Sequence, residues 1–463
     1  MNSSTASPVT RLITFATLTL ATAFGAPAIP TAGVPTPQAT PLSAWTMAPT
    51  RVVWTSPAGA IHAANLLGPK SGQALLKNPV APCVLAPAVN GAPGGGILLD
   101  FGTELAGNVE LITPIVKDKE PPLVRIRFGE SVAEAMAELG GGANAQNDHA
   151  LRDQTVRLPW LGKTTVGPSG FRFVRIDNVD PTLPVHLSEV HAVLLIRDVP
   201  QVGAFRCDDE RLNRIWQVGA YTVHLNMQEY LWDGVKRDRL VWIGDMHPEV
   251  ATINAVFGFN DVVPRSLDLT RDVTPPTEWM NGISSYSMWW VLIHEQWWLH
   301  HGNRPYLAAQ QAYLRPLLTK LAGLIDPDGR ERIDGMRFLD WPSSPNQQGV
   351  TAGLQGLLVL TLESGARLMS VLGDADVARL CTDAATRGRK IVPDVNASKS
   401  GAALLALAGL RDAQETADTV LKVGGPNGIS TFYGYYVLQA LAKAGATDTA
   451  LDFISRYWGA MLD

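Results

Sequence analysis

The stretch Asp233–Asp245 reads DGVKRDRLVWIGD and carries the densest chemistry of the chain. Three carboxylates, Asp233, Asp238 and Asp245, stand at offsets of zero, five and twelve, and cations and a tryptophan lie between them. Large apolar residues flank the stretch, and charges among such groups tend to be buried. Buried carboxylates need partners or take shifted pKa values, which suits acid–base chemistry on a sugar. An ion-paired turn between two helices is the alternative that the spacing leaves open.

The same stretch resembles the D-x-x-x-R-[ED]-R-L-x-W-x-G-D signature of the bacterial and fungal α-L-rhamnosidases, whose catalytic domain is a six-hairpin (α/α)6 barrel. The resemblance implies that Asp238 is the general acid, at a position where the family usually has the longer Glu. It also implies that Asp233 and Asp245 hold the hydroxyls of rhamnose. Two further residues of the signature are predicted to contact the substrate, namely Arg237 and Trp242.

Two later loops carry further candidates for sugar binding. Thr277–Tyr286 combines the carboxylate Glu278 with Trp279 just before a helical stretch, and a carboxylate beside an indole suits sugar hydroxyls and a ring face. The alternative is a helix cap and a core indole. In Phe338–Pro342, Asp340 and Trp341 are predicted to line the −1 subsite, with a buried packing turn as the alternative.

Length and composition narrow the class of protein. The chain has 463 residues, 46% hydrophobic and 17% charged, which is enough for two or three globular domains. Its net charge of −5 disfavours nucleic acid and anionic membrane surfaces as partners. Three distant cysteines, Cys83, Cys207 and Cys381, indicate neither a disulfide framework nor a zinc site. The chain shows no nucleotide-binding loop, and we expect neither a cofactor nor a metal ion.

The N-terminus is typical of an export signal. Arg11 precedes a short apolar run, and the small residues of Ala26–Ala28 follow it. We therefore predict a signal peptide over residues 1–28, a Pro/Ala/Thr-rich linker over 29–44, and a periplasmic or secreted protein that is not membrane-bound once the signal is removed.

The periodicity of the remaining chain changes once. Residues 45–203 contain short apolar runs bounded by Gly and Pro, which predicts a β-sandwich. Residues 204–463 repeat apolar residues at three and four, which predicts helices in antiparallel hairpins. The resemblance extends into the first part, whose matching segments imply the jelly-roll domain that precedes the rhamnosidase barrel. They are Leu99–Gly102, Phe128–Ser131, Asn147–Asp148 and Phe171–Asp177.

Helical prediction covers most of the second part. The predicted helices are Asp209–Leu225, Ile283–His301, Arg304–Ile325, Gln355–Leu372, Ala375–Lys390, Gly401–Leu410, Asp412–Lys422, Tyr435–Ala444 and Thr447–Trp458. Four tryptophans in the second of these, at positions 289, 290, 297 and 298, share one helical face and are more typical of a core than of a binding site.

The length of the helical part predicts an incomplete barrel. Twelve helices of about 12 residues with their loops need roughly 300 residues, more than residues 207–463 supply. In the resembling family a T-x-W-E run with the general base follows a segment like the C-terminal one, so the resemblance implies that the general base is not present in this chain. We then expect an exposed apolar seam (Tyr435, Tyr436, Leu438 and Leu441), poor solubility and no more than trace activity.

The predicted function is that of an exported inverting glycoside hydrolase that releases terminal α-L-rhamnose from oligosaccharides, polysaccharides or glycosides. Its expected partner is a carbohydrate substrate. Two alternatives stay open at this point: a non-catalytic or degenerate sugar-binding relative, and a six-hairpin glycosidase that acts on another sugar, such as a uronide.

Overall fold

The computed structural model describes residues 40–89, 91–116, 120–141, 146–147 and 149–463. The predicted signal peptide and most of the predicted linker lie outside these residues. The first strand begins at Leu42, inside the segment predicted as linker. Among the described residues, no helix is both long enough and apolar enough to cross a membrane.

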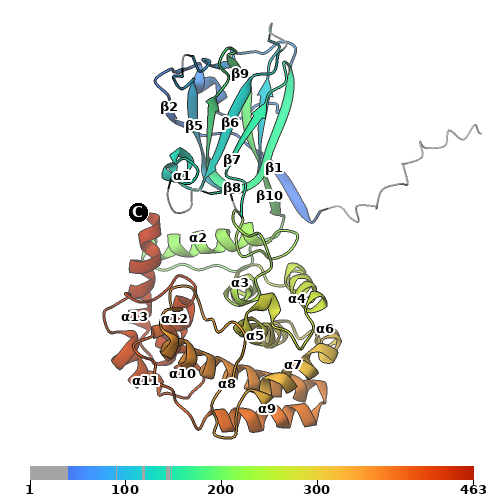
Figure 1. Cartoon of the computed structure of the whole chain (residues 1–463), viewed down its shortest axis with the longest axis vertical. Coiled ribbons are helices and arrows are strands. Elements are labelled where there is room, and N and C mark those ends of the chain that lie inside the picture. The colour runs from blue at the N-terminus through green and yellow to red at the C-terminus, as the bar shows by residue number, and fades with distance from the viewer. Residues whose placement is uncertain (1–39, 90, 117–119, 142–145, 148) are drawn as a thin grey trace, which may run out of the picture. The chain divides into compact units, whose positions relative to one another are not determined.

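Strands dominate the first part of the chain and form two antiparallel sheets (Figure 1). The strands are β1 (Leu42–Met47), β2 (Arg51–Thr55), β3 (Ala60–Ile61), β4 (Cys83–Leu85), β5 (Gly96–Thr113), β6 (Leu123–Gly129), β7 (Asp153–Arg157), β8 (Gly162–Asn178), β9 (Val185–Leu187) and β10 (Glu189–Arg197). The larger sheet has the order β1-β10-β5-β8-β6-β7, with β2 also paired to β5, and the smaller has the order β3-β4-β9. A short helix, α1 (Val132–Met136), follows β6.

Apolar side chains from both sheets form one buried core, which confirms the predicted β-sandwich. Two of the short apolar runs in this part, Gly96–Gly102 and Gly107–Thr113, belong to the single strand β5, whose pairing with β8 shifts register between Asp100 and Leu105. A bulge of this kind lets a strand pass through a Gly-containing stretch and still pair on both sides of it.

Helices make up the second part of the chain (Figure 1). They are α2 (Glu210–Asn226), α3 (Ile243–Val256), α4 (Val262–Val273), α5 (Ser284–His301), α6 (Arg304–Ala309), α7 (Gln311–Gly323), α8 (Gln347–Leu372), α9 (Ala375–Gly388), α10 (Lys399–Leu407), α11 (Ala413–Thr416), α12 (Gly434–Lys443) and α13 (Thr447–Phe453). Short π-helical turns, Ala417–Leu421 and Ile454–Trp458, extend α11 and α13.

The helices form two concentric layers, as in a six-hairpin barrel. In the inner layer α3, α5, α8, α10 and α12 pack against one another in series. The intervening helices lie outside them and return the chain between successive inner helices. Successive inner helices therefore run in the same direction, and their N-termini open onto one face of the barrel. The loops that carry Asp238, Glu278 and Asp340 precede α3, α5 and α8, so all three reach this face.

Most predicted helices are confirmed, but two were missed and one is divided. The missed helices are α3 and α4, which contain Pro248 and Pro264. Pro264 lies in the first turn of α4, where a proline costs no hydrogen bond. Pro248 lies deeper in α3 and removes one backbone hydrogen bond. Burial of the apolar face of α3 offsets this loss. The predicted helix Arg304–Ile325 is interrupted at Gln310, which separates α6 from α7.

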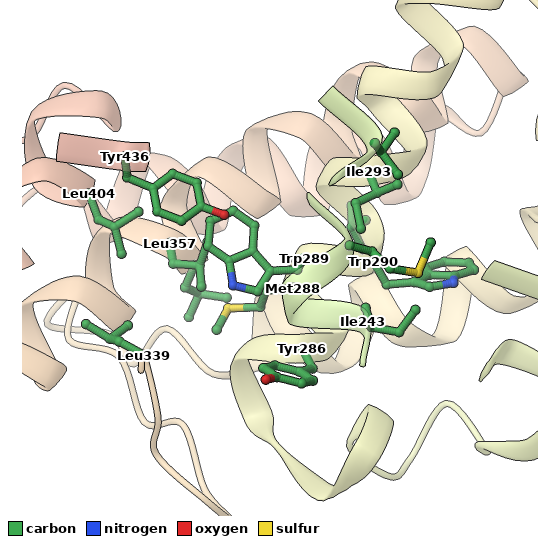
Figure 2. Close-up of a cluster of buried hydrophobic side chains, with 14 of the residues drawn as sticks. Ile243, Tyr286, Met288, Trp289, Trp290, Ile293, Leu339, Leu357, Leu404 and Tyr436 are labelled. Atoms are coloured by element: carbon green, nitrogen blue, oxygen red, sulfur yellow. The ribbon is translucent and has the colours of Figure 1, made fainter. Parts of the chain in front are cut away.

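The core of the barrel mixes aromatic and aliphatic side chains (Figure 2). Trp289, Trp290 and Trp297 of α5 are buried, which confirms the prediction of a core face, and Trp298 packs against the same core. The expected apolar seam on α12 is wrong in part. Tyr436 and Leu441 are fully buried, because α12 turns them toward α10 and α5, while Tyr435 and Leu438 are partly buried.

Candidate active site

The signature stretch forms an irregular loop that closes on itself and then enters α3. The backbone N–H of Asp233 donates to the carbonyl of Leu240 at 3.1 Å, and the N–H of Leu240 donates to the Asp233 carboxylate at 3.2 Å. Trp242 caps the helix, and Asp245 lies in its first turn. The loop thus brings two carboxylates that are twelve residues apart to the N-terminal end of one inner helix.

Burial and mutual repulsion raise the pKa values of these acids. Burial raises the pKa of Asp233 from its ordinary 3.8 to about 7, and the negative charges of Asp238 and Asp245 add to the rise. Burial likewise raises the pKa of Asp245 to about 6, with a contribution from Asp238. Since each acid acts on the next, the three signature carboxylates form one electrostatic cluster. Glu249, one turn further along α3, is buried beside them, and burial raises its pKa well above the usual range.

The raised pKa values make stability depend on pH. In the pH range from about 4 to about 7 the folded chain keeps protons on Asp233 and Asp245 that the unfolded chain has lost, so stability falls as the pH rises through this range. Asp233→Asn removes one such proton. At each pH we compare the melting temperature of the variant with that of the unmodified chain. We expect this difference to be more favourable to the variant at pH 8 than at pH 4 by roughly 2–4 °C, the shift that about 1 kcal/mol produces. Calorimetry at both pH values checks this, and a difference independent of pH would contradict it.

Tyr286 of α5 holds the Asp245 carboxyl group in place. Its hydroxyl donates to Oδ2 of Asp245 at 3.0 Å, and its ring lies edge-on to that of Trp242, with centroids 6.1 Å apart. Gly244 makes this approach possible, because a Cβ atom at position 244 would lie 2.2 Å from Cε1 of Tyr286. The glycine of the signature is therefore required by the packing of α5 against α3.

Gly244→Ala is expected to displace the Tyr286 ring from Asp245. Overpacking of this kind costs about 1–3 kcal/mol of stability. Asp245 also loses the hydrogen bond from Tyr286. Urea unfolding measures the loss of stability. Gly219→Ala in α2 is the matched control, since a Cβ atom there meets nothing within 4 Å; equal behaviour of the two variants would refute the packing argument.

Asp340 is buried and joins two loops of the barrel face. Its carboxylate accepts from the backbone N–H of Ser343 at 3.0 Å and from the hydroxyls of Ser343 and Ser430, the latter in the loop before α12. Burial raises the pKa of Tyr433 well above its usual range, and the negative charges of Asp340 and Asp245 add to the rise. Trp341 is 74% exposed and packs edge-on against Phe338. Asp340 is therefore held firmly between two loops of the barrel face, whereas Trp341 is open to solvent.

The loop before α5 places its two candidates differently. The indole N–H of Trp279 donates to Asp334 at 2.9 Å, and Nζ of Lys320 lies 3.4 Å from the ring centroid. One face of this ring is thus already covered by a cation, and the ring is partly buried against the barrel core. The Glu278 side chain is exposed.

Asn281, in the same loop, contacts the signature stretch and is a structural residue. Its Oδ1 accepts from the N–H of Ile243 and its Nδ2 donates to the carbonyl of Val241, both at 3.1 Å. The loop therefore anchors the N-terminus of α3.

Arg237 and Asp238 both point to a residue of the β-sandwich. Nδ1 of His149 lies 2.9 Å from Oδ1 of Asp238 and 3.0 Å from Nη2 of Arg237. Arg237 is exposed, and its contact with the site is the one with His149.

Four residues at the site were missed by the analysis of the sequence: His149, Tyr286, Glu249 and Tyr433. Tyr286 is the last residue of the Thr277–Tyr286 stretch, and Glu249 follows Asp245 by one helical turn. Both residues could therefore have been predicted from the sequence pattern. His149 lies 88 residues before Arg237 in the chain, and Tyr433 is equally remote, so only the fold brings them in. The described residues contain no group of three His, Cys, Asp or Glu side chains placed to hold a metal ion.

Comparisons with known proteins agree with this geometry. Residues 200–374 match the model of the bacterial α-L-rhamnosidase six-hairpin glycosidase domain. A curated α-L-rhamnosidase from Formosa agariphila is 28% identical over 160 residues, which are 33% of this chain and 16% of that protein. The match thus spans only about a sixth of the length of this relative.

Solved structures show the same fold across most of the chain. A rhamnosidase from Klebsiella oxytoca with rhamnose bound superimposes with a TM-score of 0.73 at 18% identity, covering 91% of this chain and 88% of the other. A GH78 family rhamnosidase of Bacillus sp. GL1 gives a TM-score of 0.66 at 20% identity, covering 86% and 44%. These likenesses extend through the β-sandwich and the helical barrel. They show the fold, while the match of residues 200–374 to the family model makes this segment similar to bacterial α-L-rhamnosidase six-hairpin glycosidase domains.

Proposed function

We propose that this chain is an exported glycoside hydrolase that releases terminal α-L-rhamnose with inversion at the anomeric carbon. The observation that carries the proposal is the cluster of three signature carboxylates, electrostatically coupled and partly buried, at the N-terminal face of a barrel of this family. Burial raises the pKa values of two of them, Asp233 and Asp245, and grouped carboxyl groups of this kind suit protonation of a glycosidic oxygen and binding of sugar hydroxyls.

Each carboxyl group has a role in this proposal. Asp238, on a strained turn at the mouth of the site, donates the proton to the departing glycosidic oxygen. Asp233 and Asp245 bind rhamnose hydroxyls, with Asp245 oriented by Tyr286. Trp279 and Trp341 flank the sugar or its aglycone. Their apolar faces suit the C–H faces of a pyranose ring.

An inverting reaction needs a second carboxylate that activates water on the opposite face of the sugar. Its distance from the acid is roughly 6.5–9.5 Å in such enzymes. We assign this base to none of the described residues.

A sugar-binding protein without turnover is the second candidate. The observation that favours it is Asp238 itself, because its side chain is one methylene shorter than the Glu usual in the resembling signature. The binding acids Asp233 and Asp245 would be preserved in such a protein.

Three measurements on the purified chain separate the candidates. Calorimetric titration with L-rhamnose tests binding, hydrolysis of p-nitrophenyl α-L-rhamnoside tests turnover, and proton NMR of the first-formed anomer tests inversion. Binding with turnover supports the hydrolase, and binding alone supports the second candidate. If the chain neither binds L-rhamnose nor hydrolyses the rhamnoside, but hydrolyses an unsaturated uronide when a set of other glycosides is tested, the proposal is overturned in favour of another sugar. Retention of anomeric configuration would remove the inverting mechanism.

A further inference from the structure

The β-sandwich supplies a side chain to the signature loop. His149 lies between α1 and β7, and its Nδ1 is 2.9 Å from Oδ1 of Asp238. The side chain of Asp238 is 28% exposed and that of His149 is 48% exposed. The pair therefore stands at the mouth of the site, with the carboxylate on the inner side and the imidazole in contact with solvent.

Further contacts fasten the loop to the same domain. Lys236 is buried and pairs with Glu134 of α1. A guanidinium N–H of Arg239 donates to the carbonyl of Pro168 in β8 at 3.0 Å. The backbones also meet closely at Gly170, where an added Cβ atom would lie 2.8 Å from Cγ2 of Val235. Residues on both sides of Asp238 are thus held by the β-sandwich.

The backbone at Asp238 needs this support. Asp238 and the following Arg239 have φ angles of 57° and 53°, in the left-handed region that side chains other than glycine rarely occupy. Such residues cost of order 1–3 kcal/mol each and persist only where their surroundings impose the conformation. The conformation that aims Asp238 is therefore imposed by contacts with a separate sandwich domain.

We propose that His149 is a positioning residue for Asp238, so that the β-sandwich completes the active site of the barrel. This inference rests on the proposed role of Asp238 as the general acid. It assigns to the sandwich a part in catalysis.

The imidazole suits both protonation states of its partner. In the neutral tautomer with a proton on Nδ1, the ring donates to Oδ1 of Asp238, and the other carboxyl oxygen carries the proton that faces the glycosidic oxygen. Once that proton has gone to the glycosidic oxygen, the same Nδ1–H donates to the carboxylate and keeps it in the same orientation. The contact of Nδ1 with Nη2 of Arg237 is a hydrogen bond only in the other tautomer, in which Nδ1 accepts and does not donate to Asp238. The ring therefore holds the carboxyl group before and after proton transfer.

Turnover of two substrates tests the inference. His149→Ala should lower kcat on an α-L-rhamnosyl disaccharide by roughly 10- to 100-fold, the range of one lost charge-assisted hydrogen bond, with KM within about twofold of the unmodified value. On p-nitrophenyl α-L-rhamnoside the loss should be several-fold smaller, because nitrophenolate departs with little need of a proton. A structural defect would lower both rates equally, and that result would overturn the proposal, as would unchanged rates.

Matched variants sharpen the result. His149→Asn places an amide N–H near the position of Nδ1 and should recover much of the disaccharide rate, whereas His149→Gln, whose amide lies one bond further out, should not. His300→Ala is the control, since His300 is exposed at the end of α5 and contacts a carbonyl of its own helix. Equal failure of the Asn and Gln variants would refute positioning through Nδ1.

A spectroscopic readout is independent of turnover. In protein labelled with ¹⁵N-histidine, the Nδ1 resonance of His149 should move when Asp238 is replaced by Ala, while that of His300 should stay. If the unmodified chain hydrolyses no α-L-rhamnoside, the proposed function fails and this shift still decides whether His149 holds Asp238. An unmoved resonance would show that the contact does not exist in solution.

Discussion

Asp238→Asn is expected to lower kcat on an α-L-rhamnosyl disaccharide by roughly two to four orders of magnitude, the range that general acid catalysis contributes. The amide has the size of the carboxyl group and the contact with His149 can persist, so binding of L-rhamnose should change little. The loss on p-nitrophenyl α-L-rhamnoside should be much smaller, because this substrate needs less protonation of its leaving group. Steady-state kinetics on both substrates, relative to the unmodified chain, measure the effect.

Two control variants accompany this prediction. Asp328→Asn changes an exposed acid in the turn before Gly329 and should leave both rates unaltered. Asp238→Glu restores the side chain usual in the family signature. We expect it to retain activity or raise it, because the longer chain reaches further toward the glycosidic oxygen. Normal disaccharide turnover by Asp238→Asn would remove Asp238 from the role of acid.

Trp289→Ala is expected to have the largest effect on stability, a loss of about 3–5 kcal/mol, as is usual when a buried Trp is truncated. The Trp289 ring is 2% exposed and stacks on that of Tyr436 of α12, with centroids 4.7 Å apart and planes at 14° (Figure 2). His247 of α3 packs against both rings and accepts or donates a hydrogen bond at 3.1 Å with the Tyr436 hydroxyl. The indole thus connects three inner helices, so its loss opens a cavity at the barrel centre.

Urea unfolding monitored by circular dichroism measures this loss. Trp341→Ala is the matched control, because that indole is 74% exposed and should cost less than about 1 kcal/mol. A small effect of Trp289→Ala, comparable to that of the control, would mean that the aromatic stack does not hold the barrel together.

The change of periodicity near residue 204 predicted the order of the two domains, since strand and helix repeats follow from local side-chain spacing. Helix ends were predictable where a local signal exists, as at Asp209, which accepts from the N–H groups of Arg211 and Leu212. The α3 helix was missed because Pro248 is unfavourable locally and is compensated only by tertiary burial. Similarly, Tyr436 was expected at an open seam, and only the packing of α12 on α5 shows that it is buried.

The sequence by itself determined the acids of the signature, because their spacing and residue types are local properties. It could not determine their protonation, which depends on burial and on the distances between charges. Nor could it supply the partners of these acids. Tyr286 meets Asp245 because Gly244 lets α5 approach α3, and His149 meets Asp238 because the β-sandwich docks on the loop. These contacts join residues that are far apart in the chain. They depend on the free energy of the whole packed structure, so only the tertiary structure shows them.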